Sequence, residues 1–163
     1  NALAWLYRHT PHFGIDPEKF YIAGHSAGAH LAAMMLATDW SKFAEDTPRD
    51  MIKGMVGVSG IYDLEPLLQI PSVNVDLKLT ANSAKKLSPT LLKTQSNAAI
   101  YLAAGELESA EFKRQSTLLA QNWHKNIEYN QIVINAHHLN IVDHFADRDI
   151  DLFQRTMAML NGE

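Results

Sequence analysis

The pentapeptide Gly24-His25-Ser26-Ala27-Gly28 places a serine between two glycines, where a short apolar stretch meets an alanine-rich stretch. A G-x-S-x-G turn between a strand and a helix is typical of a nucleophilic serine on a strained turn, which requires very small neighbours two residues away. The backbone N–H of Ala27 would then be one donor to an oxyanion, at a helix N-terminus. The alternative is a Gly/Ser turn without chemistry. We predict that Ser26 is a nucleophile.

A nucleophilic serine needs a histidine base and an acid that orients it, and in folds with this turn the chain order is serine, acid, histidine. Glu108 follows a predicted buried strand and precedes a predicted helix, which is where the acid is expected. A glutamate there could instead only favour the helix dipole. Asp63, after an earlier predicted strand, is the alternative acid.

Two adjacent histidines, His137 and His138, follow the last predicted strand, where the general base belongs. Spacing alone leaves the choice between them open. His144 is expected at the surface near a helix start, and His25 and His30 are expected to line the pocket or to be solvated.

Serine hydrolysis of this kind needs no metal and no cofactor, and the spacing of the histidines indicates no metal site. Tyr62, Leu64 and Leu67 could line an acyl or aryl pocket, although they fit a protein core equally well.

Strand and helix patterns alternate along the chain, which indicates βαβ units and a mostly parallel sheet with helices on both faces. We therefore predict an α/β fold, with residues 1–163 in one domain. The pattern predicts strands at 19–23, 52–59, 98–104 and 128–134, and helices at 1–10, 27–38, 81–87, 109–124 and 144–160.

The composition narrows the class of protein. Of 163 residues, 47% are hydrophobic and 20% charged, and the net charge is −4, which argues against nucleic acid or an anionic membrane as the main partner. The absence of cysteine excludes disulfides and thiolate chemistry and fits a cytoplasmic protein. No apolar run reaches the roughly 18 residues of a spanning helix. Asn1 already lies in a helical pattern, so we expect part of a longer protein.

Several segments together resemble α/β-hydrolases of the kynurenine formamidase (arylformamidase) branch, near the hormone-sensitive-lipase-like esterases. The resemblance covers almost the whole chain, and its narrower signals lie in 59–67 and 108–116. The segments are A-L-A-W-L-Y-R-H at 2–9, G-H-S-A-G-A-H-L-A-A-M at 24–34, S-G-I-Y-D-L-E-P-L at 59–67, Ser88-Pro89, E-S-A-E-F-K-R-Q-S at 108–116 and H-L-N-I-V-D at 138–143.

The resemblance implies roles for two residues. Family members usually have Asp-Ser-Pro-Glu-Phe where this chain has 108–112, which makes Glu108 the acid, one methylene longer than the usual aspartate. The usual His-Phe pair falls on His138-Leu139, which favours His138 over His137 as the base. Leu139 in place of phenylalanine changes the expected pocket wall.

The resemblance also implies a substrate class: a small acyl amide, as with N-formylkynurenine in tryptophan catabolism, or a small ester. Family members carry a His-Gly-Gly oxyanion motif and further strands before the nucleophile, and these 163 residues contain no such motif. We therefore expect an α/β-hydrolase fold truncated at its N-terminus, with low activity in this part alone. A non-catalytic hydrolase-like module is the competing hypothesis. The strand before Ser26 would then be an exposed edge of the sheet. Such an edge can pair with a second copy of the chain, so a homo-oligomer is possible.

Overall fold

Four parallel strands form the centre of the computed structural model, which describes residues 1–162. Their order in the sheet is the same as their order in the chain, and every neighbouring pair is parallel. This confirms the α/β fold with a parallel sheet. The strands are β1 (Tyr21–His25), β2 (Gly54–Val58), β3 (Ala99–Gly105) and β4 (Ile127–Val133).

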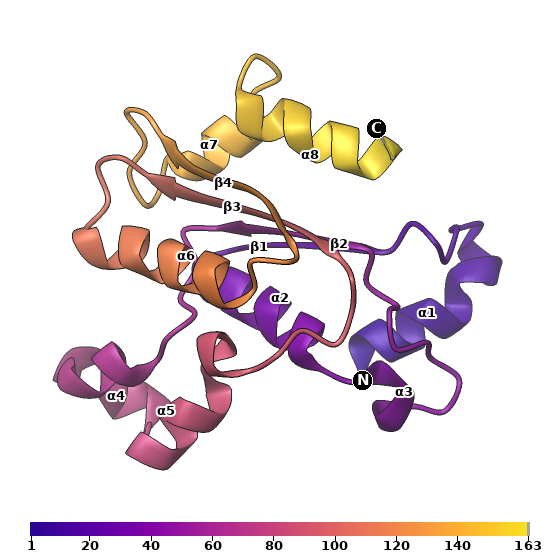
Figure 1. Ribbon diagram of the computed structural model, residues 1–163, viewed down its shortest axis with the longest axis horizontal. Helices are drawn as coiled ribbons and strands as arrows, with labels where there is room; N and C mark the ends of the chain where they lie inside the picture. Colours follow the sequence, from indigo (N-terminus) through magenta and orange to yellow (C-terminus); the bar gives the residue numbers. More distant parts are fainter. Residues whose placement is uncertain (163) are drawn as a thin grey trace.

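Helices cover both faces of this sheet, as predicted. Figure 1 shows helices both below the sheet and above it. A further helix at the start of the chain joins the lower layer through the buried Ala4. Below the sheet lie α2 (Ala27–Ala37) and α6 (Ala110–Asn122), above it lie α7 (Ile141–Ala146) and α8 (Asp151–Asn161), and the first helix is α1 (Ala2–Phe13).

Short helices fill the connections between β1 and β3. The predicted helix at 81–87 is present, and it begins at a capping box in which the Thr80 and Ser83 side chains each bond the other's backbone N–H. The sequence patterns did not predict the others. The short helices are α3 (Trp40–Phe43), η1 (Glu65–Gln69), α4 (Pro71–Leu77), α5 (Ala81–Leu87) and η2 (Pro89–Leu91). Across residues 1–162, no helix is both long and apolar enough to cross a membrane.

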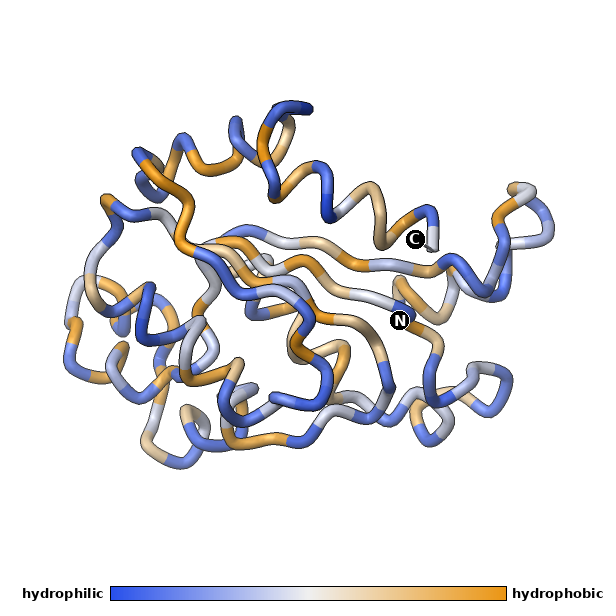
Figure 2. Tube along the Cα trace, turned by 45° about the horizontal axis from the view of Figure 1, so that its top comes forward, coloured by the Kyte–Doolittle hydropathy of each residue, from blue (hydrophilic) through white to orange (hydrophobic). Residues whose placement is uncertain are grey.

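The core has two parts, one on each face of the sheet. Because successive strand residues point to opposite faces, Met55 and Ile100 pack toward α2, whereas Val56 and Tyr101 belong to the cluster under α8. Both faces of the sheet are therefore buried, which explains the continuous apolar runs of β2 and β3. Figure 2 shows these apolar stretches along the central strands and hydrophilic residues gathered in the loops.

The first helix extends three residues beyond its predicted end at Thr10. Pro11 lies inside α1, although proline has no N–H to bond the carbonyl of Tyr7. The Thr10 hydroxyl donates to that carbonyl oxygen instead, at 2.8 Å. The helix ends at Gly14, whose φ of 66° is readily adopted only by glycine.

The last predicted helix, 144–160, is two helices in the structure. Residues 147–150 break it, because the Asp147 carboxylate accepts from the Asp149 backbone N–H at 3.0 Å and the Asp147 carbonyl accepts from Ile150 at 3.2 Å. An aspartate that bonds the backbone two residues later favours a turn over a helix. The hydrophobic spacing alone did not indicate this break.

Candidate active site

The four strands all end at one edge of the sheet, on the left in Figure 1. Their register aligns His25 with Val58, Val58 with Ala103, and Gly105 with Val133. The loops that follow the strands therefore meet at this edge. These loops carry Ser26 and the other residues predicted for the site.

Ser26 lies in a strained turn between β1 and α2. Its φ of 57° and ψ of −119° are rare for a residue with a side chain. A Cβ on Gly24 would lie 2.2 Å from the carbonyl oxygen of Gly28, so only glycine fits at position 24. A Cβ on Gly28 would meet no atom of residues 1–162 within 4 Å. Within these residues, steric crowding therefore requires glycine at position 24 but not at position 28.

The helix after this turn begins with Ala27. The N–H groups of the first helical turn have no partner inside the helix and can bond a negatively charged group. The Ala27 N–H is thus available next to the Ser26 side chain, where the sequence predicted an oxyanion donor.

The His138 imidazole lies between Ser26 and Glu108. Its Nε2 is 3.0 Å from Ser26 Oγ, and its Nδ1 is 2.6 Å from Glu108 Oε1. With the proton on Nδ1 donated to the carboxylate, the Nε2 lone pair faces the serine hydroxyl. The Glu108 side chain is fully buried while the His138 side chain is 32% exposed. The imidazole can therefore be reached from outside, whereas the carboxylate cannot.

Glu108 has a hydrogen-bond partner for both carboxylate oxygens. Oε1 faces His138, and Oε2 accepts from the Gly105 backbone N–H at 2.7 Å and from the Ser59 hydroxyl at 2.9 Å. A buried carboxylate is costly unless its oxygens are bonded in this way. The site therefore accommodates an ionised glutamate without contact to solvent.

Backbone hydrogen bonds join the loop of Glu108 to the loop of His138. The Glu106 N–H donates to the Val133 carbonyl and the Leu107 N–H to the Ala136 carbonyl, both at 2.9 Å. Gly105 allows this approach, since a Cβ there would lie 2.3 Å from the Ala136 oxygen. The ends of β3 and β4 thus bring together Glu108 and His138, which are 30 residues apart in sequence.

His137 holds its own loop instead of facing the serine. Its Nδ1 accepts from the backbone N–H groups of Leu139 and Asn140, at 3.2 and 3.3 Å. The Asn140 side chain in turn accepts from the His137 N–H at 2.6 Å. Of the two adjacent histidines, the structure places His138 beside Ser26.

Asp63, the alternative acid, lies against the side of α6. Its carboxylate accepts from the Arg114 guanidinium at 2.7 Å, and that guanidinium also binds Glu111. The hydrogen bonds from Arg114 lower the pKa of Glu111. The structure therefore places Asp63 in an ion-pair network, and Glu108 at the histidine.

Tyr62 lies in the core and not on a pocket wall, contrary to the prediction. Its side chain is fully buried, and burial raises the pKa of its hydroxyl. A Cβ on Gly57 would lie 2.3 Å from the Tyr62 hydroxyl oxygen, and a Cβ on Gly60 would lie 2.1 Å from its ring. These two glycines make the space that the ring fills beneath β2. Leu64 is also buried, with 7% of its surface exposed.

Two aromatic rings lie against His138. The ring centroid of Phe112 is 4.4 Å from that of His138, and the ring centroid of His25 is 4.6 Å from it. Burial, with a contribution from the neighbouring His138, lowers the pKa of His25. No local pattern places Phe112 at the site, although it lies four residues after Glu108 in the E-S-A-E-F segment.

A small apolar cavity of about 190 Å³ lies beside the Ser26 turn. Its walls come from the carboxyl ends of β1 and β2 and from α7. Its walls are formed by Ala23, Gly24, His25, Val58, Val142 and Phe145.

The other histidines are spread over the fold. His30 Nε2 bonds the carbonyl oxygen of Leu87 at 2.8 Å and so ties α2 to the end of α5. His144 is half-buried within α7. Across residues 1–162, no three histidine, aspartate or glutamate side chains are grouped in a way that could hold a metal ion.

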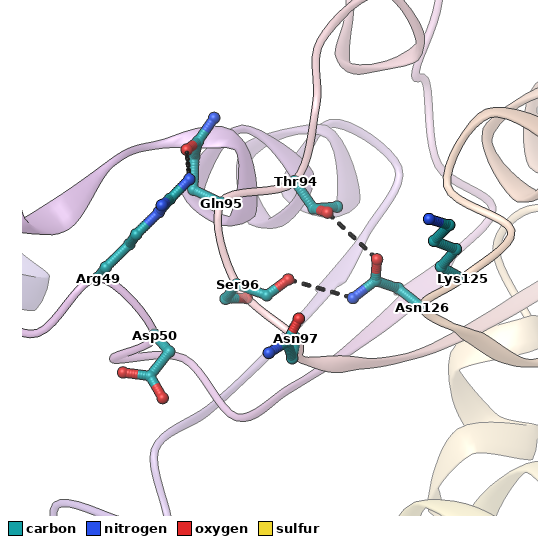
Figure 3. A pocket seen from close by; sticks show the side chains of 8 residues that line it. All are labelled: Arg49, Asp50, Thr94, Gln95, Ser96, Asn97, Lys125 and Asn126. Atoms are coloured by element: carbon teal, nitrogen blue, oxygen red, sulfur yellow. Dashed lines mark hydrogen bonds between the residues drawn. The ribbon is translucent and has the colours of Figure 1, made fainter.

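A larger and more polar hollow, about 500 Å³, lies away from this site, where the chain enters β2, β3 and β4 (Figure 3). Asn126 organises it by accepting from Thr94 and donating to the Ser96 carbonyl, and Arg49 donates to Gln95 at 2.6 Å. None of the candidate catalytic residues line it. Its walls are Arg49, Asp50, Thr94, Gln95, Ser96, Asn97, Lys125 and Asn126.

Comparisons with known proteins bear on the family and the fold of the chain. A kynurenine formamidase of Salmo salar is 41% identical over 152 residues, which is 86% of this chain and 49% of that protein. The chain thus spans about half the length of this relative. The structure is similar to that of a candidate thioesterase from Silicibacter sp., with 28% identity, a TM-score of 0.73, and coverage of 93% of this chain and 56% of that one.

The carboxylesterase EstE1, cloned from a metagenomic library, shares the fold at 18% identity, with a TM-score of 0.66 and coverage of 99% of this chain and 60% of that one. The model of the BD-FAE family matches residues 1–123. These likenesses confirm the α/β-hydrolase fold and the resemblance to the kynurenine formamidase and esterase branch. The chain belongs to the BD-FAE family.

Proposed function

We propose that the protein is a serine hydrolase that cleaves small acyl amides or esters, with Ser26 as nucleophile, His138 as general base and acid, and Glu108 as the orienting carboxylate. The observation that carries this proposal is the His138 ring, whose two nitrogens lie 3.0 Å from Ser26 Oγ and 2.6 Å from Glu108 Oε1. Both distances are within hydrogen-bond reach, as a nucleophile–base–acid relay requires.

In the first half of the reaction, Ser26 Oγ attacks the substrate carbonyl carbon while His138 Nε2 takes the hydroxyl proton. The carbonyl oxygen becomes negatively charged and accepts a hydrogen bond from the Ala27 N–H. The buried Glu108 carboxylate stabilises the imidazolium that forms. His138 then gives the proton to the leaving amine or alcohol, and an acyl group remains on Ser26.

In the second half, water replaces the leaving group. His138 takes a proton from the water as its oxygen attacks the acyl carbon, and then returns the proton to Ser26 Oγ as the ester bond breaks. The 32% exposure of the His138 side chain gives water access to this nitrogen. The products are a carboxylic acid and a free amine or alcohol.

The favoured substrate is an N-formyl aryl amide such as N-formylkynurenine. The support is the 41% identity to a protein named kynurenine formamidase, together with the apolar hollow beside Ser26. A general carboxylesterase is the second candidate, because the same serine, histidine and carboxylate would cleave small esters. Relative kcat/KM for N-formylkynurenine and a short-chain aryl ester decides between them in the intact protein.

Substitution of Ser26 by alanine tests the proposed chemistry. Ser26→Ala in the intact protein should lower kcat/KM for both substrates by a factor on the order of 10⁴ or more, because no acyl group can be transferred to the chain. Ser41→Ala is the matched control: Ser41 is an exposed serine on α3 whose hydroxyl bonds Asp39. Equal turnover by Ser26→Ala and wild type would contradict the proposal. Wild-type protein without hydrolase activity would instead indicate a non-catalytic module.

A further inference from the structure

The carboxylate of Glu108 is held by a residue that precedes it by 49 positions. Its Oε2 accepts from the hydroxyl of Ser59 at 2.9 Å, between two side chains that are both buried. Its Oε1 faces His138 Nδ1 at 2.6 Å. We propose that Ser59 is a positioning residue that keeps Oε1 of Glu108 aimed at His138. This inference rests on the proposed function, since it concerns the acid of that site.

The Glu108 side chain is long, and the Ser59 hydroxyl restricts its movement. A glutamate has three side-chain torsions, and its terminal torsion is broad, so one bond to the Gly105 N–H would let the carboxylate pivot about Oε2. A second donor on the same oxygen removes that freedom. The Ser59 bond is a charge-assisted O–H···O bond, which is stronger than one between neutral groups.

The backbone of Ser59 also indicates that its side chain is used. Its φ is 50°, in the left-handed region that glycine adopts at no steric cost. Its N–H donates to the Ala103 carbonyl at 2.7 Å, so the chain at the end of β2 is fixed in this conformation. A glycine would satisfy the backbone equally well. The serine adds only its hydroxyl, and the hydroxyl bonds Glu108.

Loss of this bond should affect turnover more than substrate binding. Without the hydroxyl, the carboxylate samples orientations in which Oε1 no longer faces His138, so fewer molecules present Nε2 correctly to Ser26. Substrate binding does not depend on this orientation, so kcat should fall while KM changes little.

The test compares Ser59→Gly and Ser59→Ala in the intact protein with an aryl ester substrate. Both remove the hydroxyl, but only glycine also relieves the positive φ, so Ser59→Gly should lose less stability than Ser59→Ala. We expect kcat to fall about tenfold in both variants, with KM within twofold of wild type. The rate of Ser26 labelling by a fluorophosphonate should fall in the same proportion.

Ser116→Ala is the matched control, because Ser116 is also buried and its hydroxyl has no hydrogen-bond partner within residues 1–162. It should keep wild-type kcat and KM. If Ser59→Gly keeps kcat within twofold of wild type, Ser59 serves only the turn and the inference is wrong. The proposed function fails separately, when wild-type protein neither turns over nor is labelled at Ser26.

Discussion

The His138 ring has to present two different nitrogens to two different partners. Only one ring orientation places Nδ1 at Glu108 and Nε2 at Ser26, because a flipped imidazole would present carbon atoms at those points. The rings of Phe112 and His25 pack against it, with centroids 4.4 and 4.6 Å away. These contacts limit rotation of the imidazole.

Removal of one of these rings should slow turnover. Phe112→Ala leaves the His138 ring without its packing on α6, and aromatic contacts of this kind contribute about 0.5–1.5 kcal/mol. We expect kcat for an aryl ester to fall about two- to tenfold in the intact protein, by steady-state kinetics. Phe43→Ala, whose ring packs on Trp40 instead, is the control and should keep its kcat. Wild-type kcat in Phe112→Ala would show that the packing is irrelevant to orientation.

At the residue scale, the sequence indicates those parts of the site that depend on local pattern. Ser26, Glu108 and His138 each follow a recognisable strand, and the structure brings the three side chains together. Ser59 and Tyr62 depend on contacts that no local pattern contains. Ser59 meets an acid 49 residues away, and the Tyr62 ring fills space left by Gly57 and Gly60.

One buried amide on α6 ties two of the elements at the site together. Gln115 accepts from the backbone N–H groups of Tyr62 and Asp63 at 2.7 and 2.6 Å. It also donates to the Asp63 carbonyl and to Glu111. The loop that follows Ser59 is thereby tied to the helix that follows Glu108.

Gln115→Ala should therefore lower the stability of the fold. Two backbone N–H groups would lose their only side-chain acceptor, and each unsatisfied buried donor costs about 1–3 kcal/mol. We expect the free energy of unfolding to fall by about 2–4 kcal/mol in urea denaturation. Gln121→Ala, exposed on the same helix, should change it by less than about 0.5 kcal/mol. Equal effects of the two substitutions would refute this account of the loop.

At the element scale, sequence patterns predict where the strands lie, but they do not predict where individual helices end. All four strands lie within two residues of their predicted positions. Apolar runs mark β2 and β3 because these two strands are buried on both faces, whereas β4 is largely exposed and is marked by β-branched residues instead. Two helix ends depend on single hydroxyl or carboxylate groups. Thr10 lets α1 continue through Pro11, and Asp147 separates α7 from α8.

The two ends of the sheet, where the strands begin and where they finish, carry different groups of residues. The carboxyl ends of the strands carry the candidate site, while the entry to β2, β3 and β4 carries the polar hollow around Asn126. The site itself lies beside β1, which pairs only with β2 within residues 1–162. His25, the last residue of β1, is partly buried there.

The lowered pKa of His25 predicts how the stability of the whole fold depends on pH. The folded state favours neutral His25, because burial lowers its pKa below the ordinary value of 6.5, so the unfolded chain binds more protons just below that pH. This contribution to stability is complete above pH 6.5 and is lost as pH falls toward the lowered value. Urea unfolding between pH 7.5 and 5 should show a slope that His25→Gln reduces. An unchanged slope in that variant would contradict the assignment.

The central claim is that His138 and Glu108 activate Ser26 as a nucleophile. Its most direct test is to treat the intact protein with a fluorophosphonate and to map the adduct by mass spectrometry. We expect a single adduct on the peptide that contains Ser26, no adduct in Ser26→Ala, and labelling slowed by at least an order of magnitude in His138→Ala. Labelling at another residue, or equal labelling of wild type and His138→Ala, would contradict the claim.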